Sequence, residues 1–339
     1  MIDLNKIINE KYIAKEENPI SQSEIYNLAS SINIKNNNKN EALLIIDAQR
    51  DFVDIEKGAL PVKGASEDIK RIIKFIYENI ESLSSIYATM DTHNYDSIFH
   101  PFLWKKPNGE YAEPFTEITL EKIENGEIIP VYKDIQIDYV KKLKEQGSKN
   151  LIIWQYHCIY GTDGWLIEKQ LSNMLTFFEV SKKTSIKKII KGLDKFTEMY
   201  GAIKPEVITN SKNQYDDSWA KEIKDYDKIF VCGEAKDYCV YETVKQFCEM
   251  YKSERNITEK IYFMQNCCSS IGDKDICDKK YKELEDIYGI KLITVWKLNS
   301  QTKRFIKKGL LLNWSKPSLN ATFYFLIHRF IFLLPLCLL

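Results

Sequence analysis

Cys239 stands in a setting where a cysteine side chain can act as a nucleophile. It follows a short apolar run, Ile229–Cys232, which Gly233 ends, and the apolar spacing after it is helical. A thiol between a strand and a helix lies near the positive end of the helix dipole, which favours the thiolate. The same stretch also fits a small buried thiol that packs the helix on the sheet, and these residues alone leave both interpretations open.

A second set of residues has the side-chain types that bind a metal ion. Asp91 and His93 are two residues apart after an apolar run, so both side chains point the same way in extended chain. His157 lies in another loop at a strand end. One carboxylate and two imidazoles suit a catalytic zinc ion or a related divalent ion. Alone, the Asp-x-His pair also fits a surface histidine beside a solvated aspartate.

Lys191 is the basic residue that could support such chemistry. It follows Ile189–Ile190 and precedes Gly192. A lysine at the end of an apolar strand can pair with a carboxylate over the sheet and lower the pKa of a nearby thiol. Taken alone, it is more simply one further surface lysine in a lysine-rich stretch.

Strands that alternate with helices must position these side chains. Apolar runs predict strands at 42–47, 85–90, 151–154, around 177–180, and at 187–191, 228–233, 260–265 and 291–296. Helices are expected from about residue 65 to 82 and near 164–174. This alternation predicts an α/β protein with three layers, α/β/α: a Rossmann-like parallel sheet of about six strands with helices on both faces. Ligands bind such sheets at the C-terminal ends of the strands, where Asp47 and Asp91 stand.

Three segments lie outside this alternation. Residues 1–40 read as an N-terminal accessory segment, and residues 101–148 as an insertion or lid. Residues 301–339 form an uncertain apolar tail. Its last part, 321–339, is apolar apart from His328 and Arg329 and approaches the roughly 20 residues that span a bilayer. It fits either a C-terminal membrane anchor weakened by that pair or an artefact of the gene model.

Composition excludes several classes of protein. The 339 residues carry 48 basic and 48 acidic side chains, so no nucleic-acid partner is expected. Eight cysteines without framework spacing indicate reduced thiols in a cytoplasmic protein. The first residues lack the apolar core of a signal peptide.

Taken together and in order, six motifs resemble those of the isochorismatase-like cysteine hydrolases and, within them, the nicotinamidases. The resemblance covers about residues 42–300, so residues 41–300 are expected to be an isochorismatase-like hydrolase domain. The matching positions are Asp47-Ala-Gln49-Arg-Asp51-Phe52, the loop from Gly58 to Ala65, Asp91-Thr-His93, Trp154-Gln-Tyr-His157-Cys158 with Gly161-Thr162, Lys191-Gly192 with Tyr200-Gly-Ala202, and Gly233-Glu-Ala235-Lys-Asp237-Tyr238-Cys239-Val240.

The resemblance implies roles for particular residues. It implies a catalytic triad of Asp47, Lys191 and Cys239, and an oxyanion hole made by the backbone N–H groups of Ala235 and Cys239. A cis peptide bond is expected between Glu234 and Ala235. The implied metal ligands are Asp91, His93 and His157, with Zn²⁺ expected and iron or manganese as alternatives. The implied substrate pocket contains Phe52, His100, Trp154, Tyr200, Glu234 and Tyr238.

Two departures from the family pattern leave the substrate open. The family's Asp-Trp-His-Pro reads Asp91-Thr-His93-Asn94 here, so the aromatic residue and the proline beside the metal are missing. His100 either replaces the family's nearby second histidine or packs in the interior. The segment 101–148 also lengthens the distance between the metal motifs.

The resemblance therefore implies a metal-dependent cysteine amidohydrolase of pyridine nucleotide (NAD) salvage. Such an enzyme hydrolyses nicotinamide to nicotinate and ammonia through a thioester on Cys239. A hydrolase of another small amide or carbamoyl compound is the alternative, followed by a non-catalytic binding or membrane-tethered protein that keeps the fold. The expected partner is a small-molecule amide. Membrane contact is expected only through 321–339, and a homo-oligomer stays open.

Overall fold

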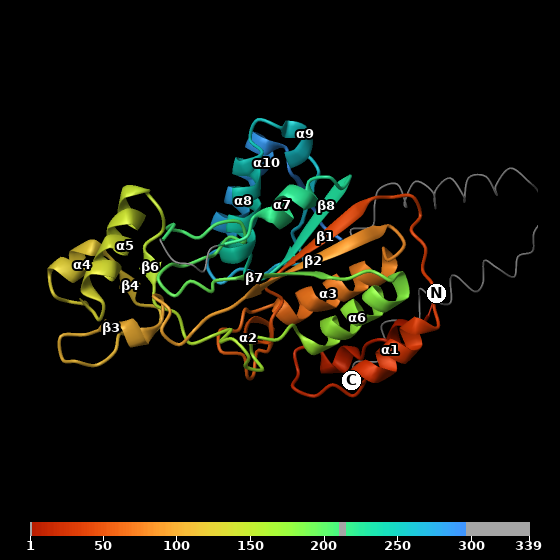
Figure 1. Ribbon diagram of the computed structural model, residues 1–339, viewed down its shortest axis with the longest axis horizontal. Helices are drawn as coiled ribbons and strands as arrows, with labels where there is room; N and C mark the ends of the chain where they lie inside the picture. The colour runs from red at the N-terminus through yellow and green to blue at the C-terminus, as the bar shows by residue number, and fades with distance from the viewer. Residues whose placement is uncertain (1, 210–214, 296–339) are drawn as a thin grey trace, which may run out of the picture. The chain divides into compact units, whose positions relative to one another are not determined.

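A parallel sheet of six strands forms the centre of the computed structural model, which describes residues 2–209 and 215–295 (Figure 1). All neighbouring strands run parallel, which confirms the predicted α/β class. Across the sheet the strands are β10 (Lys291–Ile293), β9 (Ile261–Met264), β8 (Lys228–Gly233), β1 (Glu41–Ile46), β2 (Leu83–Asp91) and β7 (Lys187–Lys191).

Strand β1 lies at the centre because it is buried on both faces. All six of its residues are buried, as expected for a parallel strand covered by helices on either side. It pairs with β2 on one side and with β8 on the other. The segments that follow these three strands therefore begin side by side.

Helices cover both faces of the sheet (Figure 1). The connections between β1, β2 and β7 place two helices on one face of the sheet, α3 (Ala65–Glu78) and α6 (Lys169–Lys182). The connections next to β8, β9 and β10 place three helices on the other face, α7 (Ser218–Ile223), α8 (Tyr241–Met250) and α10 (Lys274–Tyr288). Right-handed crossovers in opposite directions require this arrangement. The direction of winding changes between β1 and β8, and such a switch point is where α/β sheets bind ligands.

The residues before the sheet pack onto the face that carries α6. Short helical turns at Leu4–Lys6 and Glu10–Tyr12 precede α1 (Gln22–Ser30), whose first turn is closed by a capping box of Ser21 and Glu24. Ile25 of α1 is fully buried. Asn18 and Gln22 donate to the Asn173 carboxamide of α6 at 3.1 and 2.7 Å.

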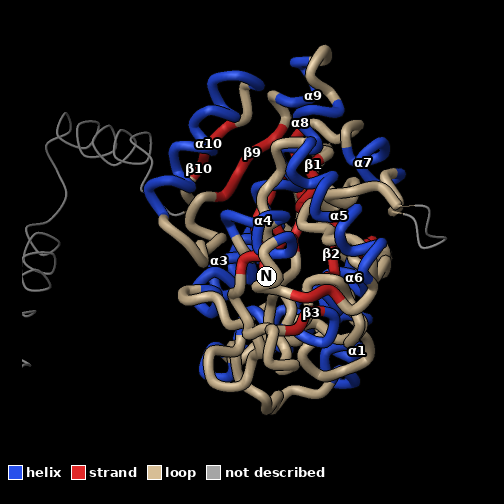
Figure 2. Tube along the Cα trace, turned by 90° about the vertical axis from the view of Figure 1, so that its left-hand side faces the viewer, coloured by secondary structure: helices blue, strands red, loops and turns tan. Residues whose placement is uncertain are grey.

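A group of short elements follows β2 and extends to one side of the sheet (Figures 1 and 2). Two strand pairs are antiparallel, β3 with β5 and β4 with β6, and two helices accompany them. Their bounds are β3 Trp104–Lys105, β4 Glu117–Ile118, α4 Leu120–Glu124, β5 Ile129–Pro130, α5 Lys133–Glu145 and β6 Leu151–Ile152. The remaining helices are α2 (Arg50–Val53) and α9 (Arg255–Thr258).

Two of the predicted strands are absent from the central sheet. Leu151–Ile152 pairs with β4 outside the central sheet, and Ile153 bonds to Thr116, so this apolar run serves the insertion. Residues 177–180 belong to α6, because Leu171, Met174 and Phe178 recur at helical spacing and are buried. The other six predicted strands are confirmed.

Among residues 2–209 and 215–295, no helix is both long and apolar enough to cross a membrane. The predicted tail, 301–339, lies outside the residues that the structure describes.

Candidate active site

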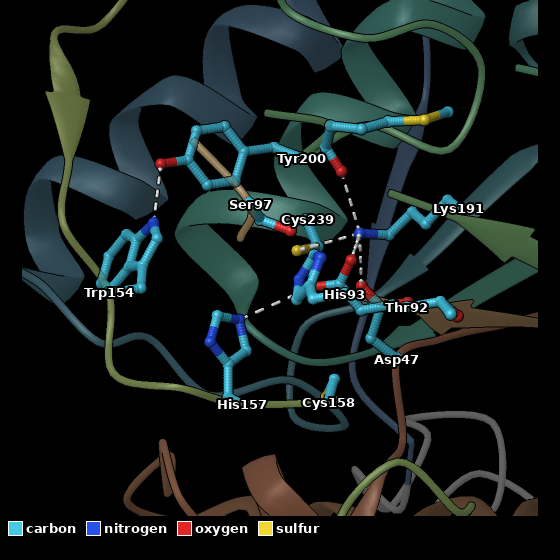
Figure 3. A network of polar contacts seen from close by, with 12 residues as sticks. Asp47, Thr92, His93, Ser97, Trp154, His157, Cys158, Lys191, Tyr200 and Cys239 are labelled. Carbon is cyan, nitrogen blue, oxygen red and sulfur yellow. Dashed lines mark hydrogen bonds and ion pairs between the residues drawn. The ribbon is translucent and has the colours of Figure 1, made fainter. Parts of the chain in front are cut away.

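Four chain segments bring chemically active side chains together at the C-terminal edge of the sheet. Asp47 follows β1, Asp91 ends β2 and Lys191 ends β7. Cys239 lies in a single π-helical turn, Lys236–Val240, that follows β8 and leads into α8. The structure thus places the three residues of the predicted triad within reach of one another (Figure 3).

The ammonium group of Lys191 lies at the centre of this cluster. Its Nζ is 3.0 Å from Asp47 Oδ2, 2.9 Å from Asp91 Oδ1 and 3.7 Å from Cys239 Sγ, and it donates to the Met199 carbonyl at 3.0 Å. Burial alone would lower the pKa of Lys191, but the two carboxylates outweigh burial and raise this pKa well above its usual value. Lys191 is therefore a permanent cation.

Asp47 is a buried carboxylate with one oxygen already occupied. Thr89 Oγ1 donates to Asp47 Oδ1 at 2.6 Å and accepts from the Asp47 N–H at 3.0 Å. Oδ2 makes no hydrogen bond with the described residues and faces Lys191. Burial raises the pKa of Asp47, while Lys191 acts in the opposite direction. A carboxylate with a raised pKa, whose Oδ2 faces Lys191 and accepts no hydrogen bond from the described residues, is suited to take up a proton.

Cys239 is a buried thiol rather than an exposed helix-terminal thiolate. Burial raises its pKa well above the usual value, and Lys191 offsets only part of that rise. The expected benefit of the helix dipole is thus outweighed by burial. The thiol must lose its proton to a base, and its sulfur lies within 4.8 Å of ligand oxygens of Asp47 and Asp91.

The turn between β8 and Cys239 is fixed on both sides of Ala235. Glu234 N–H donates to Ile46 O at 2.8 Å, and Lys236 N–H donates to Ser269 O at 2.8 Å. At Gly233, φ is +121° and a Cβ atom would lie 2.0 Å from Ile46 O, so a side chain is excluded there. The Glu234–Ala235 peptide bond is cis, which confirms that expectation.

The predicted metal ligands Asp91, His93 and His157 lie together, all buried, with one ligand atom of each within 4.8 Å of the others. The ring nitrogens of His93 make no hydrogen bond with the described residues, although Nε2 lies 2.9 Å from Asp91 Oδ2. His157 Nδ1 lies 2.7 Å from Gln155 O, and its Nε2 faces Asp91 Oδ2 at 3.8 Å. Buried nitrogens without hydrogen bonds beside a carboxylate fit a bound divalent ion.

The electrostatics of Asp91 and His157 fit a bound cation, whereas at His93 burial is outweighed by Asp91, which raises the pKa of that imidazole. Burial opposes ionisation of Asp91, but His93 and Lys191 outweigh burial and lower its pKa well below the usual value. Burial, with His93 nearby, lowers the pKa of His157 to about 3. A neutral imidazole is the form that binds a metal.

His100 lies beside the same set. Its ring centroid is 6.0 Å from those of His93 and His157, and its Nδ1 lies 2.9 Å from Asn94 O. Its Nε2 is buried without a hydrogen-bond partner in the described chain. Burial lowers the pKa of His100 to about 3.

Aromatic rings surround the space beside Cys239. Trp154 donates from Nε1 to the Tyr200 hydroxyl at 3.1 Å, and Tyr238 lies 5.3 Å from both of these rings (Figure 3 labels Trp154 and Tyr200). Phe52 lies 5.5 Å from His157 in an edge contact. Three of these predicted pocket residues thus contact one another, and Phe52 contacts a proposed metal ligand. The carboxyl group of Glu234, another predicted pocket residue, instead accepts from Ser269 N–H at 3.2 Å.

Several residues of the site carried no signal of their own in the sequence. Thr89 binds Asp47, and Gln49 exchanges two hydrogen bonds of 2.7 Å with the backbone of Asp91. Glu198 is buried next to Met199, whose carbonyl binds Lys191. Only Gln49 belongs to a motif, so it alone could have been found from the resemblance.

The insertion also reaches the site. Tyr139 of α5 accepts a hydrogen bond from Glu198 N–H at 3.1 Å. The Lys149 ammonium lies 4.4 Å from the centre of the Tyr238 ring and 5.5 Å from that of Tyr200. Cations over aromatic faces are attracted by the ring quadrupole.

Comparison with known proteins identifies the fold. No family model and no curated protein sequence matches the chain. Solved structures do match: an Acinetobacter nicotinamidase/pyrazinamidase at 18% identity and TM-score 0.51, covering 76% of this chain and 97% of that one. The yeast nicotinamidase matches at 20% identity and TM-score 0.52, covering 75% of this chain and 99% of that one. The same enzyme bound to the inhibitor nicotinaldehyde matches at 19% identity and TM-score 0.52.

Proposed function

Since the chain has the isochorismatase-like fold of the nicotinamidases, we propose that it is a cysteine amidohydrolase that cleaves a small amide, with nicotinamide as the first candidate. The observation that supports this most is the shared ammonium of Lys191, 3.0 Å from Asp47 and 3.7 Å from Cys239. A buried acid, cation and thiol in contact form an activated nucleophile.

In the first half of the reaction, the Cys239 sulfur attacks the amide carbon while Asp47 Oδ2 takes the thiol proton. The carbonyl oxygen becomes an oxyanion, which the N–H groups of Ala235 and Cys239 bind. Asp47 then returns the proton to the leaving nitrogen, the C–N bond breaks, and ammonia departs from a thioester on Cys239. Each oxyanion-hole donor is typically worth about 10²–10³ in rate.

In the second half, Asp47 takes a proton from water, whose oxygen attacks the thioester carbon. The C–S bond breaks, the carboxylic acid leaves, and Asp47 returns the proton to the Cys239 sulfur. Lys191 favours the ionised form of Asp47, the form that accepts a proton, because a neighbouring cation stabilises the charged carboxylate. Thr89 holds the other oxygen of Asp47 and so fixes the direction of Oδ2.

Asp91, His93 and His157 would hold a divalent ion, most simply Zn²⁺, and His100 offers a third imidazole nitrogen. When bound, the ion would supply a Lewis acid that fixes a ring nitrogen or another donor atom of the substrate. Trp154, Tyr200 and Tyr238 would pack against a planar ring.

A second candidate is the hydrolysis of a different amide in the same site. The contacts of Tyr139 with Glu198 and of Lys149 with Tyr238 favour it, because they bring the insertion to the substrate side of the cluster. The triad would act in the same way.

The test uses the full chain with added Zn²⁺ and measures ammonia release from nicotinamide and from a panel of other small amides. We expect Cys239→Ala to lower the rate at least about 10³-fold. Cys248→Ala is the matched control, since Cys248 is a buried free thiol on α8 and should keep the rate. Release from another amide only would favour the second candidate. Release that survives Cys239→Ala would contradict both.

A further inference from the structure

Two buried carboxyl groups lie behind the turn that carries Ala235 and Cys239. Glu234 is fully buried, and its Oε2 accepts a hydrogen bond from Ser269 N–H at 3.2 Å. Asp68 of α3 is 2% exposed and accepts from Ser269 Oγ. A single residue, Ser269, therefore joins the two acids, one through its backbone and one through its side chain.

The positive charge available to this pair suffices for one carboxylate. Arg71 Nη1 lies 3.0 Å from Asp68 Oδ1 and also donates to Asn266 O at 3.1 Å. Glu234 forms no ion pair with any residue of the described chain. A buried carboxylate without a cation costs several kcal/mol, so one of the two groups must be neutral.

Glu234 is the neutral member. Its Oε1 is buried and has no donor among residues 2–209 and 215–295, while the Asp68 carboxyl group lies within hydrogen-bonding reach of the Glu234 carboxyl group, so a proton on Glu234 has an acceptor. Burial, followed by the nearby Asp68 carboxylate, raises the pKa of Glu234 well above its usual value. Burial also raises the pKa of Asp68, to about 6, so Asp68 is mainly ionised at neutral pH beside Arg71.

We propose that Glu234 and Asp68 share one proton, and that this acid pair positions the Glu234–Cys239 turn so that its N–H groups meet the oxyanion. The second half of this statement rests on the proposed function. Glu234 is a positioning residue: it directly precedes Ala235, and its carboxyl group is turned towards Ser269 rather than towards Lys191.

The backbone contacts explain how the pair acts on the turn. Ser269 O accepts from Lys236 N–H at 2.8 Å and Cys267 O accepts from Gly233 N–H at 3.0 Å, so segment 267–269 holds the turn on both sides of Glu234. Loss of the shared proton would leave two carboxylates on Ser269. Their repulsion would displace this segment and, with it, the turn.

The groups that face the pair are a cation, a carboxylate and three thiols. Burial raises the pKa of each of these thiols, so they stay uncharged at neutral pH. These five groups come from α3, β8, the turn and the segment after β9. They are Arg71, Asp237, Cys232, Cys267 and Cys268. We therefore expect that, as pH rises into the alkaline range, Glu234 is the residue of this set that loses a proton.

The test compares Glu234→Gln, which keeps a neutral donor, with Glu234→Leu, which is neutral but cannot donate. In Glu234→Gln we expect kcat within about threefold of wild type and no decline in kcat at alkaline pH where wild type declines. In Glu234→Leu we expect kcat to fall roughly tenfold with little change in KM, because a displaced oxyanion hole affects the transition state more than binding. Glu168→Gln removes a different buried carboxyl and should keep the wild-type pH profile.

Infrared difference spectra of wild type minus Glu234→Gln supply a readout that does not depend on catalysis. We expect the carbonyl band of a protonated carboxylic acid at pH 7. Absence of that band, or an unchanged alkaline decline in Glu234→Gln, would overturn the proposal. If wild type releases no ammonia from any amide, the proposed function fails, whereas the infrared band still confirms or overturns the shared proton.

Discussion

At the scale of single residues, Lys191 links two buried carboxylates that have different tasks. Asp47 belongs to the proposed nucleophile site, and Asp91 belongs to the proposed metal site. Both are nearly inaccessible to water, so neither could be tolerated as a lone anion. The position of Lys191 is therefore a matter of stability as well as of chemistry.

Replacing Lys191 by Met should both abolish ammonia release and destabilise the fold. It leaves two buried carboxylates without their common cation, which typically costs about 3–5 kcal/mol. Urea unfolding of the two proteins measures the difference. Lys195→Met is the matched control, because its ion pair with Asp96 is more than one-third exposed on both sides and such pairs contribute about 0–1 kcal/mol. Equal losses in both variants would contradict the assigned role of Lys191.

Glu198 should make the stability of the metal-free protein depend on pH. Burial, more than any neighbouring charge, raises its pKa to about 7, whereas an unfolded glutamate titrates near pH 4.3. As pH rises from about 4.5 to 7, the unfolded chain has lost this proton and the folded chain keeps it, so the contribution of Glu198 to stability falls. Glu198→Gln should gain roughly 2–3 kcal/mol relative to wild type between pH 4.5 and 8.

Urea unfolding at several pH values, with chelator present, measures this difference. Glu110→Gln is the control of opposite sign, since hydrogen bonds from Asn108 and Lys106 lower the pKa of the exposed Glu110. A stability difference between Glu198→Gln and wild type that stays constant with pH would contradict the prediction.

At the scale of elements, a glycine allows the end of β7 to approach closely two proposed metal ligands, Asp91 and His93. Gly192 directly follows Lys191, has φ of +82°, and leaves no room for a side chain: a Cβ atom would lie 2.9 Å from His93 Cε1 and 3.1 Å from Asp91 Oδ1. The end of β7 therefore helps to shape the proposed metal site although it contributes no ligand to it.

Gly192→Ala should weaken zinc binding at least tenfold, because the added methyl group displaces His93 and Asp91. A competition assay with a zinc-binding dye measures the affinity. Gly109→Ala is matched in backbone conformation, with φ of +88°, but its Cβ atom would meet nothing within 4 Å. Both variants pay for a positive φ, roughly 1–2 kcal/mol, so only the loss of metal affinity separates them. Similar zinc affinities would contradict the prediction.

The sequence predicted the six central strands because each is an apolar run between polar segments. It could not tell Leu151–Ile152 from them, since two apolar residues look alike in a parallel sheet and in a small antiparallel pair. Residues 177–180 misled for a related reason: Phe177 and Phe178 are adjacent buried residues on a helix, and so short an apolar run looks the same in a helix and in a strand. The spacing of apolar residues indicates which side chains are buried. Which strands pair with one another depends on residues that are far apart in the sequence.

The residues of the candidate site likewise include some that the sequence could identify and some that it could not. The residues in motifs, such as Asp47 and Cys239, could be named from the resemblance. Thr89 and Glu198 could not, because they act only through neighbours that the fold brings from other segments. Glu234 was expected in the pocket from the resemblance, but its side chain turns towards Ser269. Sequence distance says nothing about the direction of a side chain in an irregular turn.

At the scale of the whole molecule, the residues before β1 share the core of the sheet domain. Ile7, Ile8, Ile25 and Ala29 are buried, and Glu168 at the start of α6 accepts from Ala14 N–H at 3.1 Å. The segment that the sequence suggested as an accessory thus covers α6 over much of its length. We expect it to unfold together with the sheet.

Ile25→Ala should lower the free energy of unfolding by about 2–5 kcal/mol in the same single transition that reports on the sheet. Tyr26→Ala, one residue along the same helix and 57% exposed, should change it by about 0.5 kcal/mol or less. Circular dichroism during urea unfolding measures both. A separate early transition for residues 1–40 would contradict the prediction.

The ammonium shared by Asp47 and Asp91 also constrains how this chain can evolve. A substitution that removes one carboxylate leaves Lys191 with the other, 2.9 or 3.0 Å away. A second substitution strands a buried cation, so the two are epistatic and their joint cost exceeds the sum. Descendants that lose both the acid–base chemistry and the metal are therefore expected to lose Lys191 only after one carboxylate has been replaced, because replacing Lys191 first leaves two buried anions.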